Sequence, residues 1–139
     1  MPNININDGR KKYTINGDEN RAFYVNLTDS GIAVRAKYAM KQLEDLAIDE
    51  TMDGIEMAIF ADEEARKQID YIFDGEVSKA VFGNISPFAV VDRETGEMFF
   101  EAFLKAILPE IEKDQKELQK SMEESEKRIA KYTSHYKRK

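Results

Sequence analysis

The chain lacks several residues on which catalysis and covalent stabilisation commonly depend. It has no cysteine, which excludes disulfides, thiolate metal ligands and a cysteine nucleophile. Its single histidine, His135, lies in a basic stretch with no carboxylate near it in the sequence to orient it as a general base. The seven glycines are scattered at turns and form no phosphate-binding loop. We therefore expect a protein that is not an enzyme and has no metal or cofactor.

Long hydrophobic runs are also missing, and the polar start Met1-Pro2-Asn3 is unlike a signal peptide. We expect a soluble protein that stays in the cytoplasm where it is made.

Positive charge is scarce as well: residues 1–126 contain 15 basic and 27 acidic side chains, whereas residues 127–139 contain six basic and no acidic ones. Because an acidic body repels nucleic acid, DNA binding would depend on the tail alone, and an ordinary solvated or disordered tail is the other interpretation.

What the sequence does contain begins with a small antiparallel sheet. Residues 4–6 and 13–15 alternate apolar and polar side chains around the turn sequence Asn7-Asp8-Gly9, which is typical of a hairpin. A second turn cluster at 16–20 precedes residues 23–27, whose apolar members fall on one face. We predict a hairpin plus a third strand. Such a sheet is too small to be stable alone, so helices must cover it.

Four to five helices are expected to do so, giving an α+β fold with one domain over residues 1–126 and a basic tail over 127–139. The first helix is predicted to begin near Asp29 as N-cap and to end within residues 48–54. Residues 55–60 fit either a strand or a buried helical turn. The second helix is predicted from about Asp62 to Phe73, because carboxylates favour helix starts.

Residues 69–84 predict a compact helical corner. The apolar helical pattern is interrupted at Asp74-Gly75, resumes for less than two turns and is interrupted again at Gly83-Asn84. Glycine tolerates the positive φ that a helix end requires, so both glycines are predicted caps. The large apolar side chains are expected to be buried. The residues of this predicted corner are Ile72, Phe73, Gly75, Val81, Phe82 and Gly83.

A long helical tract follows from Glu97, and Pro109 predicts a kink or break in it. Before Pro109 the apolar arc is wide, and a domain of this size need not bury all of it. Beyond Pro109, apolar residues recur at about two positions in seven, which is typical of a coiled-coil seam or of a helix in a partner's groove. A solvent-exposed terminal helix is the alternative. The residues predicted to bind a partner or mediate self-association are Phe99, Phe103, Ile107, Leu118, Met122 and Ile129.

The run Phe73-Asp74-Gly75-Glu76-Val77-Ser78-Lys79-Ala80-Val81-Phe82-Gly83 resembles a pattern in tail-assembly chaperones of long-tailed phages and prophages of Gram-positive bacteria. The order of the surrounding elements is also similar, from an N-terminal hairpin to a charged C-terminal helix. The resemblance implies a non-enzymatic factor that binds the tape-measure protein in the host cytoplasm, keeps it soluble, helps to bring tail-tube subunits to it and leaves the finished particle.

Three other functions remain open. Small acidic proteins without catalytic groups also include phage-encoded proteins that bind a host defence or regulatory protein. Nucleic-acid binding through residues 127–139 is the third possibility, and an enzyme is the last.

Overall fold

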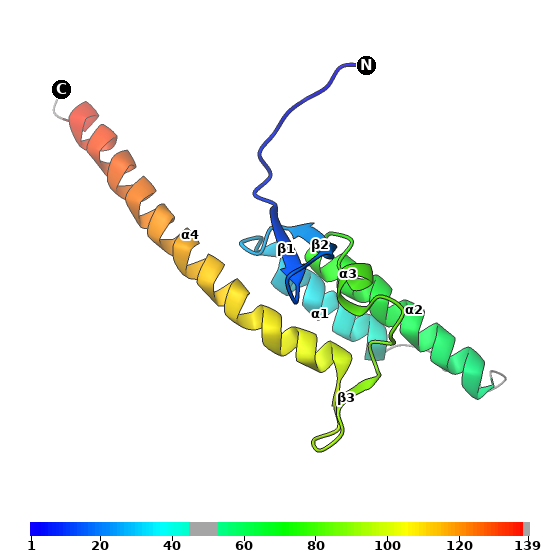
Figure 1. Ribbon diagram of the computed structural model, residues 1–139. Helices are drawn as coiled ribbons and strands as arrows, with labels where there is room; N and C mark the ends of the chain where they lie inside the picture. Colours follow the sequence, from blue (N-terminus) through cyan, green and yellow to red (C-terminus); the bar gives the residue numbers. More distant parts are fainter. Residues whose placement is uncertain (45–52, 138–139) are drawn as a thin grey trace.

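The computed structural model describes residues 1–44 and 53–137, and these form an α+β fold in which a small hairpin packs against helices and a long helix ends the chain (Figure 1). The end predicted for the first helix, together with Leu46 and Ala47 on its apolar face, lies outside the described residues. Within the described ranges, no helix combines the length and apolar character needed to cross a bilayer.

The hairpin consists of β1 (Lys11–Ile15) and β2 (Asp18–Val25), which pair antiparallel with Tyr13 opposite Phe23. Its turn is Asn16-Gly17, where both residues have positive φ, 54° and 72°, as a two-residue turn with right-handed twist requires. The predicted third strand is therefore wrong. Residues 4–6 form no strand, and the two strands that do form belong to one hairpin.

Two helices follow the hairpin. Helix α1 (Gly31–Glu44) begins after Asp29, whose carboxylate accepts a hydrogen bond from the Gly31 N–H. Helix α2 (Gly54–Phe73) begins eight residues before the predicted start, because Asp53 accepts the Glu56 N–H as its N-cap. Residues 55–60 are therefore helical, and the macrodipole argument placed the helix start too late.

The predicted corner is formed by the end of α2 and the short helix α3 (Ser78–Phe82). The left-handed residue that ends α2 is Asp74, with φ 52°, and not Gly75 as predicted. Gly75 has a different role: a Cβ there would lie 3.0 Å from the Tyr24 carbonyl oxygen, so the residue permits close approach to β2. Gly83 ends α3 with φ 56°.

Strands β3 (Val90–Asp92) and β4 (Glu97–Met98) form a second antiparallel hairpin, which the sequence did not predict. Helix α4 (Phe99–Lys137) follows directly and passes through Pro109 without a break. It also continues through the boundary predicted at residue 126. Figure 1 shows its second half leading away from the body.

The core lies where the corner, β2 and the first turns of α4 meet. Phe73 and Phe82 both pack edge-on against Phe103, with ring centroids 5.9 and 6.1 Å apart. Of the predicted corner residues, Phe73, Val81 and Phe82 are buried and Ile72 is partly buried. The remaining buried apolar residues of this cluster are Phe23, Val25, Leu27, Val77, Ala80 and Ile107.

Three arginines hold this corner by donating hydrogen bonds to its backbone carbonyls, and a fourth donates to the carbonyl just after it. Arg35 donates to the Ile72 carbonyl at 2.9 Å, Arg10 to that of Asp74 at 2.6 Å, and Arg21 to those of Ala80 and Val81 at 3.0 and 2.6 Å. Arg66 donates to the Ile85 carbonyl at 2.8 Å. The final carbonyls of a helix lack intrahelical partners, so these arginines stabilise the ends of α2 and α3.

Candidate binding surfaces

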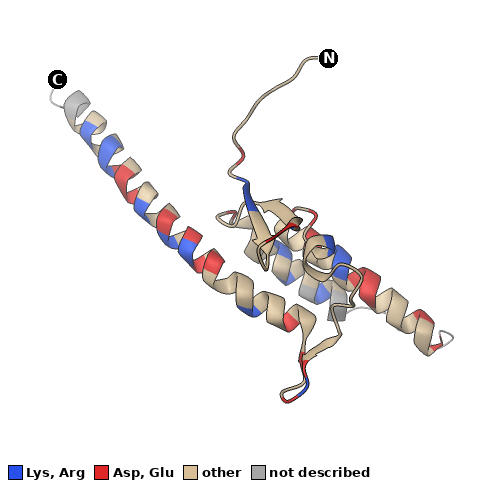
Figure 2. Ribbon diagram, in the orientation of Figure 1, with Lys and Arg blue, Asp and Glu red and all other residues tan. Residues whose placement is uncertain are grey.

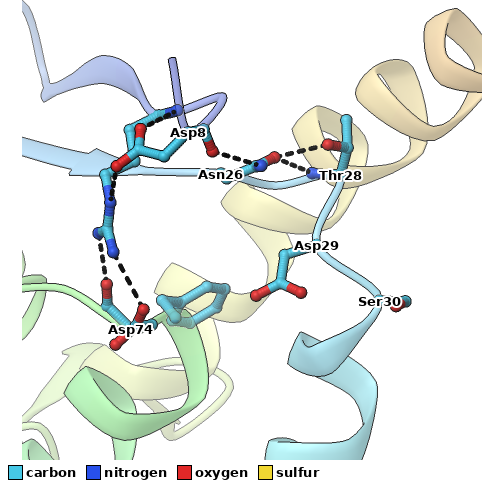
Figure 3. Close-up of a pocket in the computed structure, with 8 residues that line it drawn as sticks. Asp8, Asn26, Thr28, Asp29, Ser30 and Asp74 are labelled. Carbon is cyan, nitrogen blue, oxygen red and sulfur yellow. Dashed lines mark hydrogen bonds and ion pairs between the residues drawn. The ribbon is translucent and has the colours of Figure 1, made fainter. Parts of the chain in front are cut away.

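A polar cavity lies where the N-terminal segment meets the body (Figure 3). Arg10 is at its centre and bridges the carboxylates of Asp8 and Asp74, each at 3.0 Å. Asn26 donates to the Asp8 carbonyl at 3.0 Å and accepts from the Thr28 N–H and hydroxyl. These contacts fix residues 8–10 against the start of the β2–α1 connection.

The charges in this cavity are already paired. The N–H of Arg10 lowers the pKa of Asp8, with its guanidinium adding to the effect, and the Arg35 guanidinium lowers the pKa of Asp29. No group of three or more potential metal ligands occurs anywhere in the described residues. The paired contacts of the cavity therefore anchor the N-terminal segment to the body.

A second hollow, with a volume of about 650 Å³, lies between the hairpin and the start of α4. We call it the hairpin–helix groove. Its β side is formed by Lys12 to Asn16 together with Arg21 and Phe23, and Val81 and Val91 complete it. Its helical wall combines large apolar side chains with the small side chains of two alanines. The residues of this wall are Phe99, Ala102, Phe103, Ala106, Ile107 and Glu110. Volumes of 300–1,000 Å³ are typical of sites that hold a small ligand or a short peptide segment.

A buried polar pair links β1 to α4 beside this groove. The Tyr13 hydroxyl donates to the Asp114 carboxylate at 2.8 Å, and the Tyr13 ring stacks on Phe23 with centroids 5.7 Å apart. Asp114 is 5% exposed. Burial, with the Asp114 carboxylate adding to it, raises the pKa of Tyr13 well above its ordinary value. The pair therefore holds the hairpin against the helix while the groove beside it stays open.

The six residues predicted to bind a partner fall into two groups. Phe103 and Ile107 are buried in the core and Phe99 is partly buried against it, so all three contribute to this chain's own packing and line the groove. Leu118 is partly buried, whereas Met122 and Ile129 are 55% and 62% exposed. The structure thus separates a proximal group at the groove from a distal group on the free part of α4.

The distal group lies on a helical segment of mixed charge. Figure 2 shows few charged residues along the first turns of α4 and alternating acidic and basic residues farther along. We define the distal seam as Leu118, Met122, Ile129 and Tyr132, which recur at spacings of three, four or seven residues. Tyr132 is also exposed.

Sequence reasoning missed the groove and the residues that shape it. Tyr13 and Ile15 were predicted as strand residues, but nothing in the local pattern placed that strand beside α4. Ala102 and Ala106 carry no motif, although their small side chains leave space in the helical wall. The only sign of the groove in the sequence was that Ala102 and Ala106 follow Phe99 and Phe103 at a spacing of three residues, which places small side chains beside large ones on the helix.

Comparisons of this chain with protein-family models, with curated proteins and with solved structures gave no match. Its function must therefore be argued from the surfaces described above.

Proposed function

We propose that this protein is a non-enzymatic assembly chaperone of the phage-tail type, and that it binds the tape-measure protein through the distal seam of α4. The observation that carries the proposal is the free half of α4. In proteins most of a helix's stability comes from packing an amphipathic face against a neighbour. Met122 and Ile129 provide such a face, and they remain exposed among the residues that the structure describes.

The chemistry of the seam defines the partner it fits. A narrow apolar stripe bounded by charges of both signs is suited to packing against another amphipathic helix. The contacts in such a pair are made by apolar side chains spaced three and four residues apart. A tape-measure protein, which the resemblance of the corner implies as partner, presents long helices of this kind. The proximal group stays in the core, so the proposal assigns partner contact to the distal residues. Recruitment of tail-tube subunits is the further role that the resemblance implies.

The test is co-expression with the tape-measure protein of the same phage, measuring the soluble fraction of the tape measure. We expect this chain to raise that fraction and the double substitution Met122→Glu with Ile129→Glu to abolish the effect. The matched control is Lys120→Gln with Lys127→Gln, which changes the net charge equally but lies on the opposite face of α4. A tape measure that is equally soluble without this chain would refute the proposal.

A further inference from the structure

Residues 1–7, which we call the N-terminal arm, project away from the body as an extended segment (Figure 1). Ile4 and Ile6 are 82% and 77% exposed. The Asn3 side chain donates to that of Asn5 at 2.9 Å, so the two asparagines share one side of the arm. Because side chains alternate along an extended chain, the two isoleucines share the other side. The arm is thus an extended amphipathic segment that pairs with no strand in the described residues.

The hairpin offers the complementary feature, a strand edge without a partner. In the described residues β1 pairs only with β2. Lys12 and Thr14 line the hairpin–helix groove together with Tyr13 and Ile15, so consecutive residues of β1, which belong to both of its faces, border it. This arrangement places the free edge of β1 at the groove. Unpaired strand edges readily accept an additional strand, with main-chain hydrogen bonds giving affinity and side-chain pockets giving selectivity.

The groove also matches the arm in chemistry. Its wall is apolar where Phe99, Phe103 and Ile107 reach it, and the small side chains of Ala102 and Ala106 leave room for a branched aliphatic group. The arm has no charged side chain before Asp8, so its entry would bury no unpaired charged side chain. Two isoleucines on one side of a strand are suited to such a wall.

The arm of the same chain is poorly placed to fill this groove. A fold-back would have to reverse the chain between residues 7 and 10. Asp8 is held by the Asn26 amide and Arg10 by Asp74, and Figure 1 shows the arm leading away from the start of β1. A second copy has no such restriction. The extended chain from Asp8 to Ile4 spans about 13 Å, so the exchange requires the two bodies to lie directly beside each other.

We propose that two copies of this protein exchange their N-terminal arms, each arm adding as a strand to the free edge of β1 in the other copy and inserting Ile4 and Ile6 into its hairpin–helix groove. The exchange is reciprocal and gives a closed dimer with twofold symmetry. It uses neither the distal seam nor the tape-measure partner, so it holds or fails independently of the proposed function.

The first test measures the mass of the full chain by sedimentation across a concentration series. We expect a dimer, and we expect Ile4→Asp with Ile6→Asp to weaken it by about tenfold or more for each buried isoleucine lost. The matched control, Asn3→Asp with Asn5→Asp, adds the same charge on the opposite side of the arm and is expected to keep the dimer. Met122→Glu with Ile129→Glu is likewise expected to keep it. A wild-type monomer at all concentrations, or a dimer lost with the seam and not with the isoleucines, would overturn the proposal.

The second test locates the arm and makes use of the absence of native cysteine. One copy carries only Ile6→Cys and the other only Ala106→Cys, and the mixture is oxidised. We expect a disulfide-linked dimer of the two different variants, and less of it when Asn5→Cys replaces Ile6→Cys. A chain that carries both Ile6→Cys and Ala106→Cys and forms the disulfide within one monomer would show that the arm folds back, contrary to the proposal.

Discussion

Replacing Asp70 tests whether the corner depends on one carboxylate. Asp70 lies in the last turn of α2 and accepts three hydrogen bonds from the start of α3: from the Val77 N–H at 2.9 Å, the Ser78 N–H at 2.8 Å and the Ser78 hydroxyl at 2.9 Å. Val77 and Ser78 are buried, so water cannot easily replace the lost acceptor. The residue therefore serves as a tertiary cap for α3, whose own N-cap residue makes no side-chain hydrogen bond.

The magnitude follows from those three bonds. A hydrogen bond to an ionised group contributes about 1.5–3 kcal/mol, but bonds that share one carboxylate are not additive. We expect Asp70→Ala to lower the free energy of unfolding by about 2–4 kcal/mol. Asp70→Asn keeps one side-chain oxygen that can accept from the N–H groups of Val77 and Ser78, so it should lower the free energy of unfolding by only about 1 kcal/mol.

Urea unfolding followed by far-ultraviolet circular dichroism measures these differences. At a slope of about 1.5 kcal/mol per molar urea, Asp70→Ala should lower the midpoint by about 1–3 M without changing the slope. Glu63→Ala is the control, because Glu63 is an exposed residue of the same helix and should stay within about 0.5 kcal/mol. If Asp70→Ala is as stable as this control, the carboxylate does not hold α3.

Three further substitutions test other features of the fold. Gly75→Ala places a Cβ 3.0 Å from a backbone oxygen and should lower the free energy of unfolding by about 1–3 kcal/mol. The control is Gly54→Ala, whose Cβ meets no atom within 4 Å and should not destabilise the protein. If urea unfolding gives the same free energy of unfolding for both variants, the close approach at Gly75 is contradicted. Pro109→Ala restores a donor inside a continuous helix and should raise stability by about 1–3 kcal/mol, and an unchanged urea midpoint would show that the helix tolerates proline there. Tyr13→Phe removes a phenol whose pKa is raised in the folded state, so wild-type stability should fall relative to the variant as the pH rises above about 10. The absorbance difference between the two proteins should titrate above the ordinary tyrosine range, and a midpoint near 10 would contradict the buried pair.

The sequence predicted the elements that local chemistry decides. The α+β class, the strands near Tyr13 and Phe23 and the long C-terminal helix all follow from periodicity and turn residues. The missed start of α2 was also local in origin, because Asp53-Gly54 carries a capping signal that the carboxylates at 62–64 obscured.

Contacts between segments that are distant in the sequence could not be predicted from local residue patterns. The alternation at Ile4 and Ile6 is a genuine strand pattern, but a pattern does not say whether a partner strand is within reach. The strands of the second hairpin have only three and two residues, which is too short for periodicity to reveal. The candidate surfaces depend on where α4 passes the hairpin, which is set by packing between residues about 100 positions apart, such as Tyr13 and Asp114.

The arginine contacts of the corner have a consequence for the order in which the chain folds. The donors Arg35, Arg10 and Arg21 are separated from their carbonyl acceptors by 37, 64 and 59 or 60 positions. Loops of that length must close before the ends of α2 and α3 gain these partners. The short helix α3, whose Ala80 and Val81 carbonyls accept from Arg21, is therefore expected to form late and to show low φ-values in a kinetic analysis. An isolated peptide of residues 69–84 should accordingly remain a coil, because its ends would lack the side chains that complete them.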